Sequence, residues 1–402
     1  MTAKASSGST AVLTIALCYL VAIFEGFDLQ AAGVAAPALK GVFNLTPNQL
    51  SWFFSSSTFG LMLGAAVGGR LSDRFGRKAV LIASVAVFGA MSVLTGLAQD
   101  VNMLMLARFL TGAGIGGALP NLVALASENA SPARKNTAVG LLYAGLPSGG
   151  ALSSLITLLG GHGDWRTVFF VGGIAPLVAV PLLLFVLPDS QQQKAVAGQG
   201  KKVSFATAAF GEGRAARTLL LWVAFFLSLL TMYLLLNWLP TLMVARGLSR
   251  ADASIVQMLF NVFGAIASMV TGLLMDRLSL RNVVILSFAS AAVGLLALAG
   301  APPAFSISMA VGALVGITMS MTQALLYAVA PSNYPTEMRG TGVGTAVSVG
   351  RLGSAAGPIL AGMLLTSGRT PDDVLSILVP IILVAGVAAL ALAVLMKRAE
   401  AR

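Results

Sequence analysis

Charged residues are scarce in this 402-residue chain: Asp, Glu, Lys and Arg make up 10% of it, whereas hydrophobic residues make up 57%. Soluble domains carry about 25% charged residues, so a soluble globular protein is excluded. Cysteine occurs once, which excludes an internal disulfide and a cysteine metal cluster. No phosphate-binding loop, zinc-ligand spacing or hydrolase triad is present. The sequence therefore predicts no catalytic residue, no metal site and no cofactor, and we expect a protein that is not an enzyme.

Apolar runs of membrane-spanning length recur along the whole chain. They fall near 12–37, 50–69, 79–98, 102–126, 137–159, 167–187, 217–241, 252–275, 282–300, 305–330, 341–366 and 374–396. Each is long enough to cross a bilayer, which takes roughly 20 apolar residues. Each is predicted to be helical, because a lipid-facing backbone has to satisfy its own hydrogen bonds. The first run contains two carboxylates and no cleavage site after a short core, so we expect a retained helix and not a signal peptide.

The positive charge is distributed unevenly between the loops. The net charge of +11 could suggest a nucleic-acid partner. Outside the apolar runs, however, eighteen Lys and Arg residues fall on one set of alternating loops and five on the other. This asymmetry is the positive-inside rule. It predicts a multi-pass protein of the bacterial inner membrane with both termini in the cytoplasm, a lipid bilayer as surroundings and no nucleic-acid partner.

Two short patterns repeat at nearly the same offset, close to half the chain length. Residues 69–74 match 272–277, and residues 135–140 match 339–344. The agreement of the two offsets indicates duplication of a six-helix unit. We therefore predict an N-terminal bundle at 1–187, a polar cytoplasmic linker at 188–216 and a C-terminal bundle at 217–402. Inverted or parallel repeats of this kind place the substrate site at their interface, near the bilayer midplane.

The repeated loop carries glycines, a carboxylate and several basic residues. Glycine permits a tight turn between two helices, and Asp can cap a helix or pair with a basic neighbour. One interpretation is a determinant of topology alone. The other is a cytoplasmic gate formed by Gly69, Asp73, Arg74, Gly76 and Arg77, with Asp276 and Arg277 in the second copy.

This loop closely resembles the cytoplasmic loop motif of the major facilitator superfamily. Further segments resemble other motifs of the superfamily: 108–116, 145–150, 165–166 and 334–340. Within it, residues 25–28 resemble the Asp-Gly-x-Asp signature of the aromatic acid:proton symporter family, with Glu25 in place of the first Asp. Residues 237–240 and 350–353 resemble the same family, and the resemblance covers the chain from about residue 11 to its end.

Four charged residues fall well inside apolar runs, away from their ends, where such groups usually mark a transport pathway or a proton relay. Glu25 and Asp28 share one helix face, and Arg108 lies at a similar depth in the fourth run. We interpret Asp28, Glu25 and Arg108 as the proton-coupling group. The alternative is a static set of buried ion pairs that holds helices together. The single histidine falls in a predicted loop, so proton coupling has to use carboxylates.

Arg351 lies near the middle of its run, and neither its own run nor the symmetry-related one offers an obvious acidic partner. A guanidinium can hold a carboxylate through two hydrogen bonds, so Arg351 is the first candidate for substrate binding and Arg108 the second. Weaker candidates are polar groups that could bind a ring hydroxyl or could equally join helices: Asn237, Tyr233, Gln323, Tyr327 and Asn121.

The residues and the resemblance together predict an all-α integral membrane protein with twelve transmembrane helices in two six-helix repeats. The resemblance implies import of an aromatic carboxylate, similar to hydroxyphenylpropionate or hydroxybenzoate, for catabolism. Protons would enter with it, the proton gradient would supply the energy, and the protein would act as a monomer. A proton-driven drug exporter is the main alternative, because residues 145–150 are close to an antiporter-type motif. A sugar or dicarboxylate porter and a membrane sensor of aromatics are less favoured.

Overall fold

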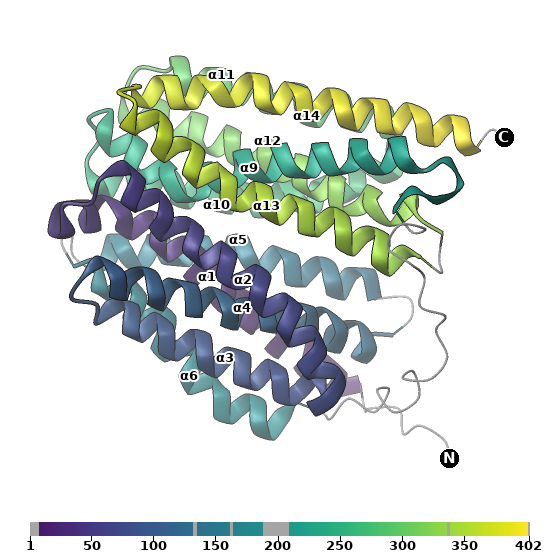
Figure 1. The fold of residues 1–402 in the computed structure, drawn as a ribbon, viewed down its shortest axis with the longest axis horizontal. Coiled ribbons are helices and arrows are strands. Elements are labelled where there is room, and N and C mark those ends of the chain that lie inside the picture. The colour runs from purple at the N-terminus through teal and green to yellow at the C-terminus, as the bar shows by residue number, and fades with distance from the viewer. Residues whose placement is uncertain (1–7, 132–134, 161–163, 188–208, 336–337, 401–402) are drawn as a thin grey trace. The chain divides into compact units, whose positions relative to one another are not determined.

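The computed structural model describes residues 8–131, 135–160, 164–187, 209–335 and 338–400. In chain order the helices are α1 (Gly8–Phe43), α2 (Pro47–Phe75), α3 (Arg77–Gly96), α4 (Val101–Asn129), α5 (Lys135–Leu159), α6 (Arg166–Val186), η2 (Gly211–Gly213), α9 (Ala215–Ala245), α10 (Arg250–Arg277), α11 (Leu280–Gly300), α12 (Phe305–Val329), η3 (Ala330–Asn333), α13 (Arg339–Thr366) and α14 (Pro371–Glu400). Within the described residues, twelve of these helices are long and apolar enough to cross a membrane (Figure 1). The predicted fold class is confirmed. Most of the predicted linker, residues 188–208, lies outside the described residues.

Polar residues in short connections determine where several helices begin. Asp100 caps α4 by accepting a hydrogen bond from the backbone nitrogen of Met103 at 2.9 Å. Ser249 caps α10, and Ser279 caps α11, in the same way. Such caps satisfy backbone N–H groups that the first turn of a helix leaves unpaired.

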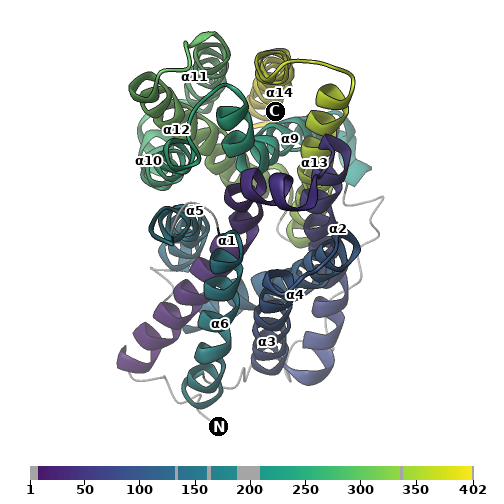
Figure 2. The same ribbon diagram turned by 90° about the vertical axis from the view of Figure 1, so that its left-hand side faces the viewer.

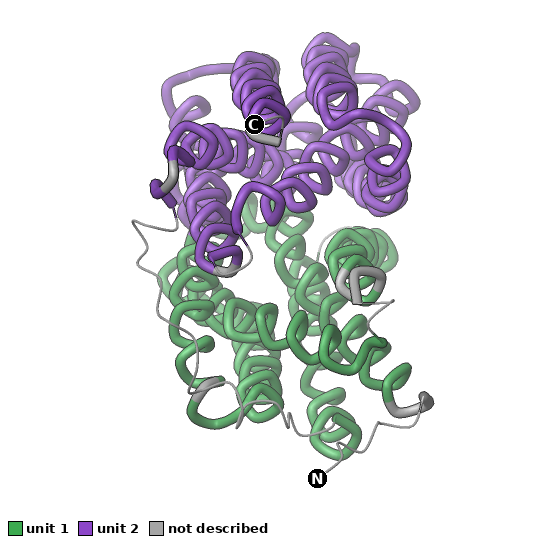
Figure 3. Tube along the Cα trace, turned by 90° about the vertical axis from the view of Figure 1, so that its right-hand side faces the viewer, with its two compact units in different colours: residues 1–43, 56–200 green, residues 44–55, 201–402 purple. Residues whose placement is uncertain are grey.

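The first compact unit comprises residues 1–43 and 56–200 (Figure 3, green). In it α1 packs on α4, α5 and α6, and α3 packs on α4 and α6. The α2–α4 contact is very close, because a Cβ at Gly60 would lie 1.9 Å from the carbonyl oxygen of Phe109. Small residues of this kind allow close backbone approach, which drives helix association in membranes.

The second unit comprises residues 44–55 and 201–402 (Figure 3, purple). Here α9 packs on α12, α13 and α14, and α11 packs on α12 and α14. The contact of α10 with α12 corresponds to that of α2 with α4, and α10, α11 and α12 form one group in Figure 2. Helices α9 to α14 therefore repeat, in order, the pairing of α1 to α6. This agreement supports the duplication inferred from the sequence.

The start of α2 groups with the second unit, whereas the sequence had placed all of 1–187 in the N-terminal bundle. Ser55 Oγ donates a hydrogen bond to the carbonyl oxygen of Ala355 at 2.9 Å. The ring of Phe54 meets that of Trp238 edge-on, with centroids 5.4 Å apart. Helix α2 therefore belongs to both units, and the boundary between them falls inside a continuous helix.

Candidate functional site

An ion pair between α1 and α4 is fully buried in the first unit. Arg108 Nη1 donates a hydrogen bond to Asp28 Oδ1, and both residues are 0% exposed. Arg108 Nη2 donates to the backbone oxygen of Asp28 at 3.1 Å and to Ser57 Oγ at 3.4 Å. The structure thus brings together the two residues that the sequence paired by depth.

An aromatic ring and two glycines surround this pair. The guanidinium carbon of Arg108 lies 5.8 Å from the centre of the Phe169 ring, within the range of a cation–π contact. A Cβ at Gly112 would lie 1.9 Å from the carbonyl oxygen of Ser57, and one at Gly116 would lie 2.0 Å from another carbonyl oxygen of α2. These glycines therefore serve close helix approach, and they do not leave room for a ligand.

The Asp28 carboxylate keeps unused capacity to bind a proton. Within the described residues, its Oδ2 atom is buried and accepts no hydrogen bond, and Arg108 Nε donates none. A carboxylate offers about four lone-pair positions, so a proton can bind at Oδ2 while Oδ1 faces the guanidinium. Glu25, which lies on the same face of α1, is also 0% exposed. Two carboxylates and one arginine are therefore buried in the described part of this unit, which suits a proton relay and a static set of ion pairs alike.

Arg351 occupies a different environment, on α13 in the second unit. Its side chain is half-buried, and its Nη1 donates a hydrogen bond to the phenol oxygen of Tyr233 at 2.5 Å. The guanidinium carbon lies 5.8 Å from the centre of the Tyr233 ring. Asn237, one turn further along α9, donates its side-chain N–H to the backbone oxygen of Tyr233 at 2.8 Å. The structure thus brings three predicted substrate-binding residues together at the α9–α13 contact.

Close packing of α13 against α9 fixes the positions of Arg351, Tyr233 and Asn237. A Cβ at Gly353 would lie 2.1 Å from the carbonyl oxygen of Phe226, so α13 and α9 touch through their backbones. Trp238 Nε1 donates a hydrogen bond to the carbonyl oxygen of Pro358 at 3.1 Å, which links the two helices again. Arg351 is therefore carried on a rigid helix pair.

Gln323 and Tyr327 lie one turn apart on α12. Gln323 Nε2 donates a hydrogen bond to Ser228 Oγ of α9 at 3.0 Å. The Tyr327 ring meets the Phe225 ring edge-on, with centroids 5.2 Å apart. Both residues thus line the contact between α12 and α9.

Asn121 is engaged in joining helices. Its side-chain oxygen accepts a hydrogen bond from Ser72 Oγ of α2 at 2.7 Å, and its side-chain nitrogen donates to the carbonyl oxygen of Gly117 at 2.8 Å. The residue is 3% exposed. Of the two interpretations open for Asn121, these contacts favour helix joining over binding a ring hydroxyl.

The first copy of the repeated loop, residues 69–78, forms the tight turn expected from its glycine. Helix α2 ends at Phe75 and α3 begins at Arg77, and Gly76 between them has a φ of 91°. Residues with a Cβ rarely adopt this conformation. Arg77 forms an ion pair with Glu128 at the end of α4, and Arg74 is exposed. The side chain of Asp73 lies outside the described part of the chain, and Gly69 has open space where a Cβ would be.

The second copy of the loop turns without a glycine. Helix α10 ends at Arg277, and Ser279 begins α11 by accepting a hydrogen bond from the backbone nitrogen of Asn282 at 3.4 Å. Asp276 and Arg277 are both exposed. The two loops therefore share their charged positions and differ in how the chain turns.

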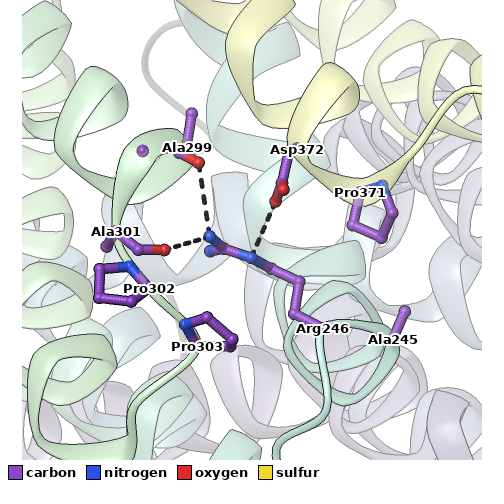
Figure 4. Close-up of a pocket in the computed structure, with 9 residues that line it drawn as sticks. Ala245, Arg246, Ala299, Ala301, Pro302, Pro303, Pro371 and Asp372 are labelled. Carbon is purple, nitrogen blue, oxygen red and sulfur yellow. Dashed lines mark hydrogen bonds and ion pairs between the residues drawn. The ribbon is translucent and has the colours of Figure 1, made fainter.

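Arg246 lines a pocket at one end of the second unit (Figure 4). The guanidinium Nε pairs with Asp372 at 2.9 Å, Nη1 donates to the carbonyl of Leu298 at 2.9 Å, and Nη2 donates to those of Ala299 and Ala301 at 3.4 and 2.5 Å. All three nitrogens are engaged, at the ends of α9 and α11 and at the start of α14. Arg246 thus joins the ends of these helices, and the pocket that it lines is no candidate for substrate binding.

Sequence reasoning missed Ser57, Phe169 and Ser228, which contact the predicted site residues. Ser57 lies in a run of hydroxyl residues, and nothing in its spacing distinguishes it from its neighbours. Phe169 is one of several aromatic residues in an apolar run. Ser228 is a polar residue flanked by leucines on both sides in an apolar run, a signal that could have identified it.

Comparisons with known proteins identify the family and the fold of the chain. A family model described as Major Facilitator Superfamily matches residues 18–358 and 221–402. The 3-(3-hydroxy-phenyl)propionate transporter of Escherichia coli (strain K12) is 44% identical, and the alignment covers 98% of this chain and 96% of that protein. The gallate transporter of Pseudomonas putida is 32% identical, with 89% and 86% covered. The crystal structure of a D-xylose-proton symporter is similar in fold, with a TM-score of 0.74 at 18% identity and 97% of each chain covered.

Proposed function

Because the chain belongs to the Major Facilitator Superfamily, we propose that it imports an aromatic carboxylate together with protons by alternating access. One observation carries the substrate class: the near-full-length identity of 44% to a transporter of a hydroxyphenylpropionate. The similarity to a gallate transporter extends this support to hydroxylated aromatic acids as a class.

Arg351 binds the substrate carboxylate in this proposal. It combines a permanent positive charge with partial exposure, and Tyr233 orients it from one side. A guanidinium presents paired N–H donors to a carboxylate, and an aromatic neighbour suits the ring of the substrate. Asn237 supports Tyr233 through the α9 backbone.

Asp28 carries the transported proton. In the unprotonated state its charge is balanced by Arg108, and a proton at Oδ2 would weaken that pairing. The net charge buried in the first unit would then change with each proton bound, which couples protonation to the stability of one conformation over another. Glu25, buried on the same face, shares this role.

The remaining properties follow from the same proposal. The proton gradient supplies the energy, no cofactor takes part and no covalent bond of the substrate changes, so the protein is not an enzyme. It acts as a monomer in the bacterial inner membrane with both termini in the cytoplasm. These properties would serve the catabolism of aromatic compounds.

Uptake by purified protein in liposomes tests the proposal. Radiolabelled 3-hydroxyphenylpropionate, 4-hydroxybenzoate and benzoate are offered with an inward proton gradient, with and without a protonophore. We expect gradient-dependent accumulation of at least one acid and its loss with the protonophore. No accumulation of any acid, together with gradient-driven extrusion of a preloaded cationic drug, would favour the exporter alternative instead.

A further inference from the structure

The side-chain oxygen of Gln323 is a buried acceptor without a hydrogen bond. Oε1 has no partner among the residues that the structure describes, although the residue as a whole is half-buried. Buried polar atoms are nearly always hydrogen-bonded, so an exception calls for a physical reason. Leaving such an atom unpaired is unfavourable, and a ligand that supplies a donor would remove the penalty.

The neighbouring hydroxyl groups determine which end of the amide is presented. Thr322 Oγ1 donates its one hydrogen to the carbonyl of Met319 at 2.7 Å, so it can only accept from Ser228 Oγ, which lies 3.2 Å away. Ser228 therefore uses its own hydrogen on Thr322. The oxygen of Ser228 can therefore only accept a further hydrogen bond. The side-chain atom of Gln323 that lies 3.0 Å from it must be the NH₂ nitrogen, which donates.

This chain of hydrogen bonds leaves Gln323 with an oriented acceptor. If the amide rotated, its oxygen would face a hydroxyl with no hydrogen left to give. Oε1 is consequently held on the side away from Ser228, where it accepts and cannot donate. A phenol hydroxyl is a donor that fits it, whereas a methoxy group of similar size is not.

We propose that Gln323 is a specificity-determining residue that binds a hydroxyl group on the aromatic ring of the substrate. The inference rests on the proposed transport of an aromatic acid and deepens it. Ser228 and Tyr233 are five residues apart on α9, about 7.5 Å of helix rise. The Ser228 end of this stretch carries Gln323, and the Tyr233 end carries Arg351. Both polar groups therefore lie on helices packed against α9, within about one and a half turns of each other along its axis.

The aromatic pair next to Gln323 is consistent with this assignment. Tyr327, on the next turn of α12, packs edge-on against Phe225 of α9. The two rings lie about one turn from Gln323 and Ser228 on the same two helices, and ligand sites commonly combine a few polar groups with aromatic side chains. Because Oε1 is buried, binding includes a local side-chain movement that exposes it.

Equilibrium binding in detergent tests the proposal with three probes that differ at one ring position: 3-(3-hydroxyphenyl)propionate, its 3-methoxy analogue and 3-phenylpropionate. We expect the wild type to bind the hydroxy compound about 10-fold or more tightly than either of the others. In Gln323→Met, which keeps the side-chain length and lacks the acceptor, the preference should fall below about 2-fold. The matched substitution Gln257→Met, on α10 in the same unit, should keep it.

Ser228→Ala gives an independent reading, because it frees the amide to rotate and offer its NH₂ group. The methoxy compound should then gain affinity relative to the hydroxy compound. Full preference for the hydroxy compound in Gln323→Met, or no preference in the wild type, would overturn the assignment. Failure of the wild type to bind any of the three acids would instead count against the proposed function, so the two failures are distinguishable.

Discussion

The two arginines inside the membrane-spanning helices differ in what holds them. Arg108 is 0% exposed and faces the carboxylate of Asp28, whereas Arg351 is half-buried and donates to the neutral phenol of Tyr233. Both lie on helices that contact a neighbour through glycine, so the backbone setting is alike. The difference lies in the partner. A buried carboxylate balances the charge of an arginine and can bind a proton, while a phenol gives a half-buried arginine a hydrogen bond and no charge.

The largest effect is expected from Asp28→Asn, which tests whether the carboxylate that faces Arg108 carries the proton. We expect gradient-driven accumulation of aromatic acid to be abolished, because Asn cannot bind the transported proton, while substrate binding survives. Removing one member of a buried ion pair also costs about 3–5 kcal/mol, so the melting temperature should fall. Uptake in liposomes and binding in detergent measure the two effects separately.

Ser57→Ala is the control for Asp28→Asn, because Ser57 contributes a contact of 3.4 Å and no charge. It should leave accumulation nearly unchanged. Normal accumulation by correctly inserted Asp28→Asn protein would show that the pair is structural.

Arg351→Ala tests whether the second arginine binds the substrate carboxylate. We expect the dissociation constant for an aromatic acid to rise roughly 30-fold or more, since losing the charged partner of a carboxylate costs about 2–5 kcal/mol where binding removes both groups from water. Arg351→Lys should have a smaller effect, because Lys keeps the charge and loses the two-pronged geometry. Tyr233→Phe should have the smallest effect of the three.

The amide of the same acid provides the control for charge. Wild-type protein should prefer the acid to the amide, and Arg351→Ala should bind both equally weakly. If the variant keeps its full preference for the acid, Arg351 is structural and Arg108 becomes the better carboxylate site.

Glu25→Gln tests whether the second buried carboxylate of the first unit also binds a transported proton. Glu25 is buried on the face of Asp28, so it shares the proton load if both carboxylates titrate. We expect a partial loss of accumulation, smaller than in Asp28→Asn. Accumulation equal to the wild type across a range of external pH would assign Glu25 a purely structural role.

The two gate loops should give the smallest effects, confined to rate. Asp73→Asn should slow uptake more than it weakens binding, because the loop is remote from the midplane. The matched substitution Asp276→Asn should have less effect, since Asp276 is exposed beside a serine-capped turn. Equal losses in uptake rate and in binding for Asp73→Asn would contradict a gating role.

The amino-acid sequence by itself determined the number, type and order of the membrane helices and the duplication of the six-helix unit. The hydropathy of a span is summed over about twenty residues, so one atypical residue does not change whether the span is recognised. The sequence also identified Glu25, Asp28, Arg108 and Arg351, because ionisable groups are conspicuous in apolar runs. The similar depths of Asp28 and Arg108 in their helices also predicted that the two residues could meet.

The tertiary structure decided the rest, because it depends on which helix faces meet. The sequence allowed two roles for Asn121, and its contact with α2 favours helix joining. The start of α2 groups with the second unit through side chains such as Ser55. The direction of the Gln323 amide follows from hydroxyl groups on two helices. Hydrogen-bond direction and close backbone approach depend on three-dimensional neighbours, which no periodicity along a single chain encodes.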